Sequence, residues 1–130
     1  MNYLLDADWV IDALVGRRRA DEILTELSSK GIAISWVTVG EIYEGAYGYP
    51  DPPTHLDTLR EFLQPLHFLG LNDPIEVKFA EIRSSLRRQG QIISDFDIVL
   101  AATALHHDLT VLTRNLRHFT RIPDLKVYQP

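Results

Sequence analysis

The sequence predicts an α/β fold built on a mainly parallel sheet of four or five strands, with helices packed against it. The first observation is that short apolar or β-branched runs, suited to buried strands, alternate with longer segments whose apolar residues recur at helical spacing. The second is that glycines and prolines separate these segments. Strands that alternate with helices are typical of parallel sheets covered by helices. The predicted strands are residues 2–5, 32–35, 66–69, 110–113 and, at an edge, 125–128.

The helices between these strands are predicted by apolar stripes and by residues that favour helix ends. Asp8 is the predicted N-cap of the first helix, and Thr38 and Glu41 have the spacing of a capping box. Three prolines within residues 50–53 predict a loop at residues 48–53, because proline is excluded from helix interiors. The predicted helices are residues 9–15, 18–29, 38–47, 54–63, 74–89 and 96–107, followed by a turn or short helix at 115–118.

Length and composition favour one domain that spans residues 1–130. A chain of 130 residues, 45% of them hydrophobic, has the usual size of a single domain with its own core. The absence of cysteine excludes a disulfide framework and a cysteine nucleophile, and it fits a reducing compartment such as the cytoplasm. We expect no signal peptide, because acidic residues interrupt the N-terminal apolar segment. We expect no membrane span, because no apolar run approaches roughly 18 residues.

The charge balance argues against a general nucleic-acid binder, because the net charge is -5. The positive residues are nevertheless grouped, so the sequence leaves local contacts with phosphates open. The groups are residues 17–19, residues 87–88, and Arg114, Arg117 and Arg121.

Acidic and polar side chains follow the ends of the predicted strands. Asp6 ends the first strand, Glu41 comes shortly after the second, and Asp97 opens the last long helix. The carboxyl ends of parallel strands meet at one edge of a sheet. We therefore expect these acids to converge there, together with Thr113 and Asn115 after the fourth strand. Each acid could separately cap a helix, but capping does not explain a carboxylate that ends an apolar strand, where burial is costly.

Clustered carboxylates predict a bound cation, because they repel one another and raise one another's pKa unless a positive charge holds them. Oxygen ligands favour Mg²⁺ or Mn²⁺, and the five histidines show no paired spacing typical of a metal site. Such an ion can activate a water and stabilise charge on a phosphate. We predict that Asp6 and Asp97 bind the ion directly, and that Glu41 binds it through water or positions the attacking water.

Four segments together resemble the PIN-domain ribonucleases, and more closely the VapC toxins of bacterial toxin–antitoxin pairs. The resemblance spans nearly the whole chain, and its third and fourth segments are the most specific. The segments are Leu4-Leu5-Asp6-Ala7-Asp8, Ser35-x-x-Thr38-x-x-Glu41, Asp97-Ile98-Val99-Leu100-Ala101-Ala102-Thr103-Ala104 and Leu112-Thr113-Arg114-Asn115-x-x-His118-Phe119.

This resemblance implies a PIN-like three-layer sandwich and a Mg²⁺- or Mn²⁺-dependent endoribonuclease toxin that hydrolyses phosphodiester bonds in RNA. Asp6, Glu41 and Asp97 match the family's three acidic metal-binding positions. Asn115 matches a fourth catalytic position, where many relatives carry Asp, which puts a tightly held second metal in question. The resemblance further implies a cytoplasmic protein that forms homodimers and is inhibited by a cognate antitoxin, with no membrane partner.

Residues near the acids are candidates for supporting roles. Thr113 and Ser35 are expected to orient carboxylates. Arg114 and Arg117 are equally suited to contacts with RNA phosphates and to a solvated surface. His118 is predicted to be structural.

Two alternative functions remain open from the sequence. Asp6-Ala7-Asp8-Trp9-Val10 fits the Asp-x-Asp-x-Val motif of haloacid-dehalogenase-type phosphatases, with Asp6 as nucleophile and Asp8 as acid–base. The chain is short for that fold and lacks its later lysine and acidic pair. The second alternative is a non-catalytic PIN-like module that binds RNA or protein. The three acids count against this module, whereas Asn115 keeps it open.

Overall fold

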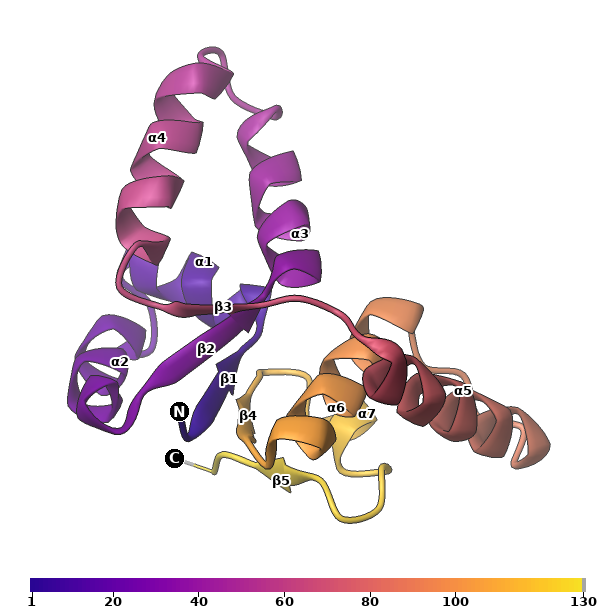
Figure 1. Ribbon diagram of the computed structural model, residues 1–130. Coiled ribbons are helices and arrows are strands. Elements are labelled where there is room, and N and C mark those ends of the chain that lie inside the picture. Colours follow the sequence, from indigo (N-terminus) through magenta and orange to yellow (C-terminus); the bar gives the residue numbers. More distant parts are fainter. Residues whose placement is uncertain (130) are drawn as a thin grey trace.

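A parallel sheet of five strands forms the middle layer of the protein (Figure 1), in a computed structural model that describes residues 1–129. The strand order is β3-β2-β1-β4-β5, and every neighbouring pair runs parallel. The predicted α/β class, the parallel sheet and the C-terminal edge strand are therefore confirmed. The strands are β1 (Tyr3–Leu5), β2 (Ile32–Ser35), β3 (His67–Leu69), β4 (Thr110–Leu112) and β5 (Lys126–Val127).

Helices cover both faces of this sheet (Figure 1). Each long helix lies close to where the sequence predicts it, and the differences are at the helix ends. None of the helices in residues 1–129 is long and apolar enough to cross a membrane. The α-helices are α1 (Ala7–Val15), α2 (Ala20–Leu27), α3 (Trp36–Ala46), α4 (Pro52–Leu63), α5 (Asp73–Arg88), α6 (Asp95–His107) and α7 (Leu116–Phe119), with a 3-10 turn, η1 (Ser28–Lys30).

The sheet has a separate hydrophobic core on each face, because successive strand residues point to opposite sides. Leu4 and Val111 belong to the core shared with α5, α6 and α7. Leu5 and Leu112, the next residues on the same strands, belong to the core shared with α1, α2, α3 and α4. The central strand β1 is thus buried on both faces, which explains its uninterrupted apolar sequence.

Two helices begin two residues earlier than predicted, directly after their strands. The side chain of Asp6, not Asp8, caps α1, since Asp6 Oδ1 accepts the Ala7 N–H at 2.7 Å. Ser35 caps α3, since its Oγ accepts the Val37 N–H at 3.1 Å. The predicted capping box of Thr38 and Glu41 is therefore wrong. Both caps are the last polar residues before a helix, so sheet and helix meet without a loop.

The proline-rich segment is also helical earlier than predicted. Residues 48–53 were expected to form a loop, but α4 begins at Pro52. Asp51 caps this helix by accepting the Thr54 N–H at 3.4 Å, and the Thr54 hydroxyl donates to the same carboxylate at 2.7 Å. Proline is compatible with the first turn of a helix, because its missing N–H has no intrahelical partner there.

Shortening a buried side chain of the central strand β1 should destabilise the protein strongly. Leu4 is fully buried between β1 and the helices of its core. We expect Leu4→Ala to lower the free energy of unfolding by about 2–5 kcal/mol, because it removes buried methyl groups and leaves a cavity. Val77→Ala, at an exposed position on α5, is the matched control and should change it by less than about 0.5 kcal/mol. Equal effects of both variants in chemical denaturation would contradict the assigned core.

Candidate active site

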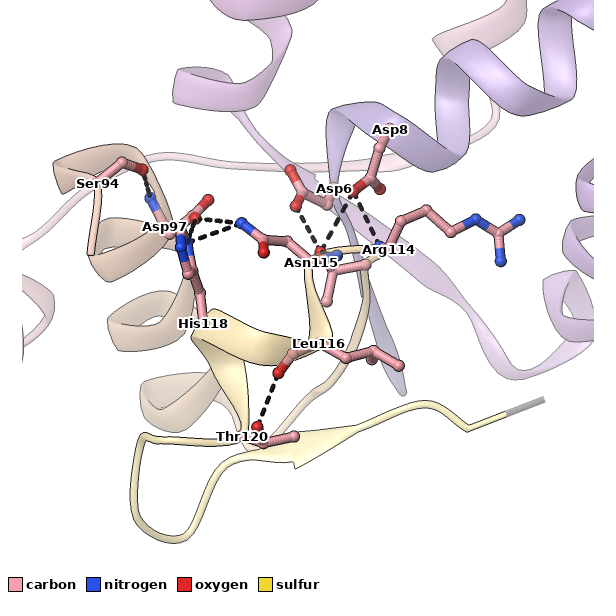
Figure 2. A network of polar contacts seen from close by, with 10 residues as sticks. Asp6, Asp8, Ser94, Asp97, Arg114, Asn115, Leu116, His118 and Thr120 are labelled. Atoms are coloured by element: carbon pink, nitrogen blue, oxygen red, sulfur yellow. Dashed lines mark hydrogen bonds and ion pairs between the residues drawn. The ribbon is translucent and has the colours of Figure 1, made fainter. Parts of the chain in front are cut away.

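The carboxyl edge of the sheet brings together the polar residues that follow β1 and β4. Leu5 pairs with Leu112 in register, so Asp6 and Thr113 emerge side by side. The Asp6 N–H also donates to the Leu112 carbonyl at 2.9 Å, which extends this pairing by one step. Asp97 approaches from the first turn of α6 (Figure 2). The structure therefore confirms that the ends of these segments meet at one edge.

Asp6 is buried and held by hydrogen bonds to both of its carboxylate oxygens. Its Oδ1 accepts the Ala7 N–H, and its Oδ2 accepts the Thr113 hydroxyl at 2.8 Å. The Thr113 oxygen in turn accepts the Asn115 N–H at 3.0 Å. Thr113 therefore fixes the orientation of Asp6, as expected, and links it to the segment after β4.

Asp97 is held from the opposite side of the site. Its Oδ2 lies 3.0 Å from Asn115 Nδ2 and 2.8 Å from His118 Nδ1. Its backbone N–H donates to the Ser94 hydroxyl at 3.2 Å, which caps α6. Figure 2 shows Asn115 between Asp6 on one side and Asp97 with His118 on the other. His118, predicted to be structural, is thus in direct contact with a predicted metal ligand.

Asp8 belongs to the same cluster, on the first turn of α1. Its Oδ2 accepts the Arg114 N–H at 2.9 Å and lies 3.4 Å from the Thr113 hydroxyl. Its Oδ1 is buried and receives no hydrogen bond from residues 1–129. A buried carboxylate oxygen without a donor is costly unless a cation or water meets it.

Burial and mutual repulsion disfavour the charged forms of three carboxylates. Burial, followed by the charge of Asp8, raises the pKa of Asp6 to about 7, and the charge of Asp97 adds to this rise. Burial also raises the pKa of Asp8. The pKa of Glu41 is raised by burial and then by the charges of Asp97 and Asp8. Asp6, Asp8, Glu41 and Asp97 therefore share one electrostatic environment, although they lie far apart in the sequence.

This donor set fits a hard divalent cation that keeps part of its water shell. No group of three or more His, Asp or Glu side chains within residues 1–129 is placed so that it could hold a metal ion. Mg²⁺ does not require such a group, because it retains several waters and is bound through one or two carboxylates. The acids near the edge offer only oxygen ligands, Asp8 Oδ1 has no donor, and repulsion within the cluster calls for positive charge.

Arg114 neither faces solvent nor is free to contact an RNA phosphate, the two roles considered for it from the sequence. Its Nε donates to Asp12 Oδ2 at 2.9 Å, and its guanidinium carbon lies 3.9 Å from the centre of the Trp9 ring. The side chain is largely buried, so neither a phosphate contact nor a solvated surface describes it. Instead, the ion pair ties α1 to the segment after β4. The signal available in the sequence was weak: Asp8 and Asp12 are four residues apart and therefore share one face of α1.

An apolar groove of about 400 Å³ lies beside the acidic edge, between α1, α3 and α4. Its α1 wall includes Ile11 and Val15, which are 51% and 55% exposed. Glu41 on α3 also lines it. Apolar side chains that are exposed along a groove are typical of a surface that binds another molecule.

Comparisons with known proteins were made on both sequence and fold. The family model for the PIN domain matches residues 3–125. The chain is 31% identical to the ribonuclease VapC2 of Haemophilus influenzae over 128 residues, 97% of this chain and 96% of that protein. It is 26% identical to the tRNA(fMet)-specific endonuclease VapC of Salmonella typhimurium over 127 residues, 98% of this chain and 96% of that one.

The fold is similar to that of solved toxin–antitoxin complexes. A crystal structure of VapBC2 from Rickettsia felis, bound to a DNA fragment from the promoter, contains a chain with a TM-score of 0.90 to this one. That chain is 25% identical, and the match covers 98% of both chains. These similarities favour the nuclease interpretation and give no support to the phosphatase alternative.

The raised pKa of Asp6 predicts how stability depends on pH in the absence of divalent ions. Because the folded pKa of about 7 lies above the ordinary value of 3.8, the protonated carboxyl favours the folded state. This contribution is complete below the ordinary value and is lost as the pH rises through 7. Asp6→Asn does not titrate and keeps a good N-cap.

We therefore expect the melting temperature of Asp6→Asn, relative to the wild type in EDTA, to rise between about pH 5 and pH 8. Differential scanning fluorimetry across this range measures it. A difference that stays constant with pH would mean that Asp6 ionises in the folded protein as it does in the unfolded chain.

Proposed function

The chain belongs to the PIN-domain family, and on this basis we propose that it is a VapC-type toxin, a divalent-metal-dependent endoribonuclease inhibited by a cognate antitoxin. One observation carries the assignment of the site. Asp6 and Asp97 are brought to the same edge of the sheet, and hydrogen bonds from residues 113–118 hold both. The proposed function is also supported by the similarity to ribonucleases that match almost the whole chain.

The side chains have distinct roles in this proposal. Asp6 and Asp97 hold Mg²⁺ or Mn²⁺ directly, and Glu41, on the neighbouring helix, binds it through water or positions the attacking water. Thr113 keeps the Asp6 carboxylate in place through its hydroxyl. When bound, the ion supplies an activated water and positive charge for the phosphate that is cleaved. Asn115 contributes an amide where a fourth carboxylate would add a ligand, so the site holds one ion more tightly than a second.

Loss of either ligand carboxylate should abolish RNA cleavage while the fold is kept. We expect Asp6→Asn and Asp97→Asn to reduce cleavage of transfer and ribosomal RNA fragments to background, because each change removes a charged ligand of the ion. Cleavage by the wild type should require Mg²⁺ or Mn²⁺ and stop in EDTA. Asp21→Asn, at an exposed position in the first turn of α2, is the matched control and should cleave normally. A fully active Asp97→Asn variant with a native circular dichroism spectrum would contradict the assignment.

The groove is the surface that we assign to the antitoxin. The structural neighbours are toxin–antitoxin complexes, and the groove presents apolar side chains beside Glu41. An apolar antitoxin segment that fills it ends next to the acidic edge and thereby blocks access to it. The same family resemblance supports a homodimer that acts in the cytoplasm, where its RNA substrates lie.

A charge placed in the groove should separate inhibition from cleavage. We expect Val15→Asp to weaken binding of the cognate antitoxin, sought in the neighbouring reading frame, because a buried charge in an apolar contact is costly. Cleavage of RNA by this variant alone should match the wild type. Val77→Asp places the same charge at a similarly exposed site on α5 and should bind the antitoxin normally. Unchanged inhibition of Val15→Asp would assign the antitoxin to another surface.

The non-catalytic alternative has weaker support. A module that only binds RNA or protein does not need three acids at one edge of the sheet. The raised pKa values of Asp6 and Glu41 show that their charged forms are disfavoured in the metal-free protein. Maintaining such a cluster costs stability, which is expected where the carboxylates serve a reaction.

A further inference from the structure

Two nitrogen donors converge on a single oxygen of Asp97. Asn115 Nδ2 lies 3.0 Å and His118 Nδ1 lies 2.8 Å from Asp97 Oδ2, and the two nitrogens are 2.7 Å from each other (Figure 2). Among the described residues, none donates a hydrogen bond to the other oxygen, Oδ1. The two oxygens of this carboxylate are therefore in different environments.

The arrangement favours the tautomer of His118 that carries a proton on Nδ1, because a hydrogen bond to a charged carboxylate is stronger than one between neutral groups. An asparagine Nδ2 can only donate, whereas a histidine Nδ1 donates or accepts according to its tautomer. If Nδ1 were unprotonated, its lone pair would face the Asp97 oxygen at 2.8 Å, and two acceptors would be in contact. Protonated Nδ1 instead donates to Asp97. Both contacts with Oδ2 are then hydrogen bonds, and Oδ1 stays available. The 2.7 Å contact between Asn115 Nδ2 and His118 Nδ1 then joins two donors and is not a hydrogen bond.

The two donors are held firmly by the short helix α7 and its flanking residues. Asn115 is the N-cap residue of α7, and its carbonyl accepts the His118 N–H at 3.1 Å. The next residue, Phe119, is fully buried in the core beneath α6. Asn115 also donates its backbone N–H to Thr113, which holds Asp6. A continuous series of hydrogen bonds thus connects Asp6 to Asp97 through Thr113 and Asn115.

We propose that His118 is a positioning residue which, together with Asn115, holds Asp97 Oδ2 so that Oδ1 is the atom offered to the metal ion. This inference rests on the proposed metal-dependent function. It adds to the site His118, which carries no negative charge and acts through Asp97. Histidine and asparagine side chains that hydrogen-bond to a ligating carboxylate fix its orientation and so raise its affinity for the ion.

The proposal also explains why an amide suits position 115. An aspartate there would place a second carboxylate where Asn115 Nδ2 now donates, about 3.0 Å from Asp97 Oδ2. Two carboxylates at this separation repel each other unless an ion lies between them. With an amide and an imidazole, Asp97 keeps its orientation before any ion arrives.

A calorimetric titration of Mn²⁺ alone into the full chain tests the role of His118. Substitution His118→Leu removes the donor, and we expect the affinity for Mn²⁺ to fall by about 10–100-fold. Substitution His118→Asn places an amide nitrogen close to the position of Nδ1 and should restore an affinity near that of the wild type. A purely structural role would not distinguish these variants in this way. Equal Kd values for His118→Leu and the wild type, or no rescue by His118→Asn, would overturn the proposal.

If His118→Leu does not fold, a second variant tests whether Asn115 and His118 hold Asp97 Oδ2. We expect Asn115→Asp to lower the melting temperature in EDTA, because two carboxylates then face each other. Mn²⁺ should raise its melting temperature by more than it raises that of the wild type. An Asn115→Asp variant with an unchanged melting temperature in EDTA would contradict the proposal that hydrogen bonds from Asn115 and His118 hold Asp97.

Mn²⁺ binding and RNA cleavage by the wild type distinguish a failure of the proposed function from a failure of the role of His118. If the wild type neither binds Mn²⁺ nor requires a divalent ion for cleavage, the proposed metal dependence fails and the role of His118 fails with it. If the wild type binds Mn²⁺ and cleaves RNA, but His118→Leu binds it equally well, only the role of His118 is wrong.

Discussion

The hydrogen bond from the Thr113 hydroxyl to Asp6 joins two strands at the point where the backbone ladder ends. It spans 2.8 Å between side chains at the ends of β1 and β4, and both residues are buried. A carboxylate at the end of a central strand is otherwise exposed to the full cost of burial. Thr113 offsets part of that cost, and its remaining lone pair accepts the Asn115 N–H. Asp97 of α6 is positioned relative to Asp6 through this short connection.

The fold creates the acidic edge and also determines its cost. Parallel strands place all of their carboxyl ends on one side, and α1 and α3 begin immediately after β1 and β2. The first turns of these helices stabilise negative charge through their exposed N–H groups. That stabilisation is insufficient for Asp6, whose pKa remains raised to about 7. In the proposed metal-dependent function, a bound cation offsets this repulsion and so links the occupancy of the site to the stability of the protein.

The sequence was sufficient for those features that depend on local patterns. Apolar runs followed by acids gave the strands and their carboxyl ends, so the approach of Asp6 and Thr113 could be expected before the structure was known. The helix starts at Trp36 and Pro52 were missed, because a cap directly after a strand and a proline in a first turn look like loop signals. The contacts of His118 and Arg114 were missed for a different reason. They depend on how α7 and α1 pack against the site, and residue spacing alone does not specify that packing.

The ion pair between Arg114 and Asp12 gives α1 two functions on adjoining faces. One side of the helix holds the segment after β4 through Asp8 and Asp12. The adjoining face, with Ile11 and Val15, forms a wall of the groove. Because a buried ion pair is costly to break, it holds this helix and that segment together. The wall of the groove and the residues that hold Asp6 and Asp97 are therefore joined through a single helix.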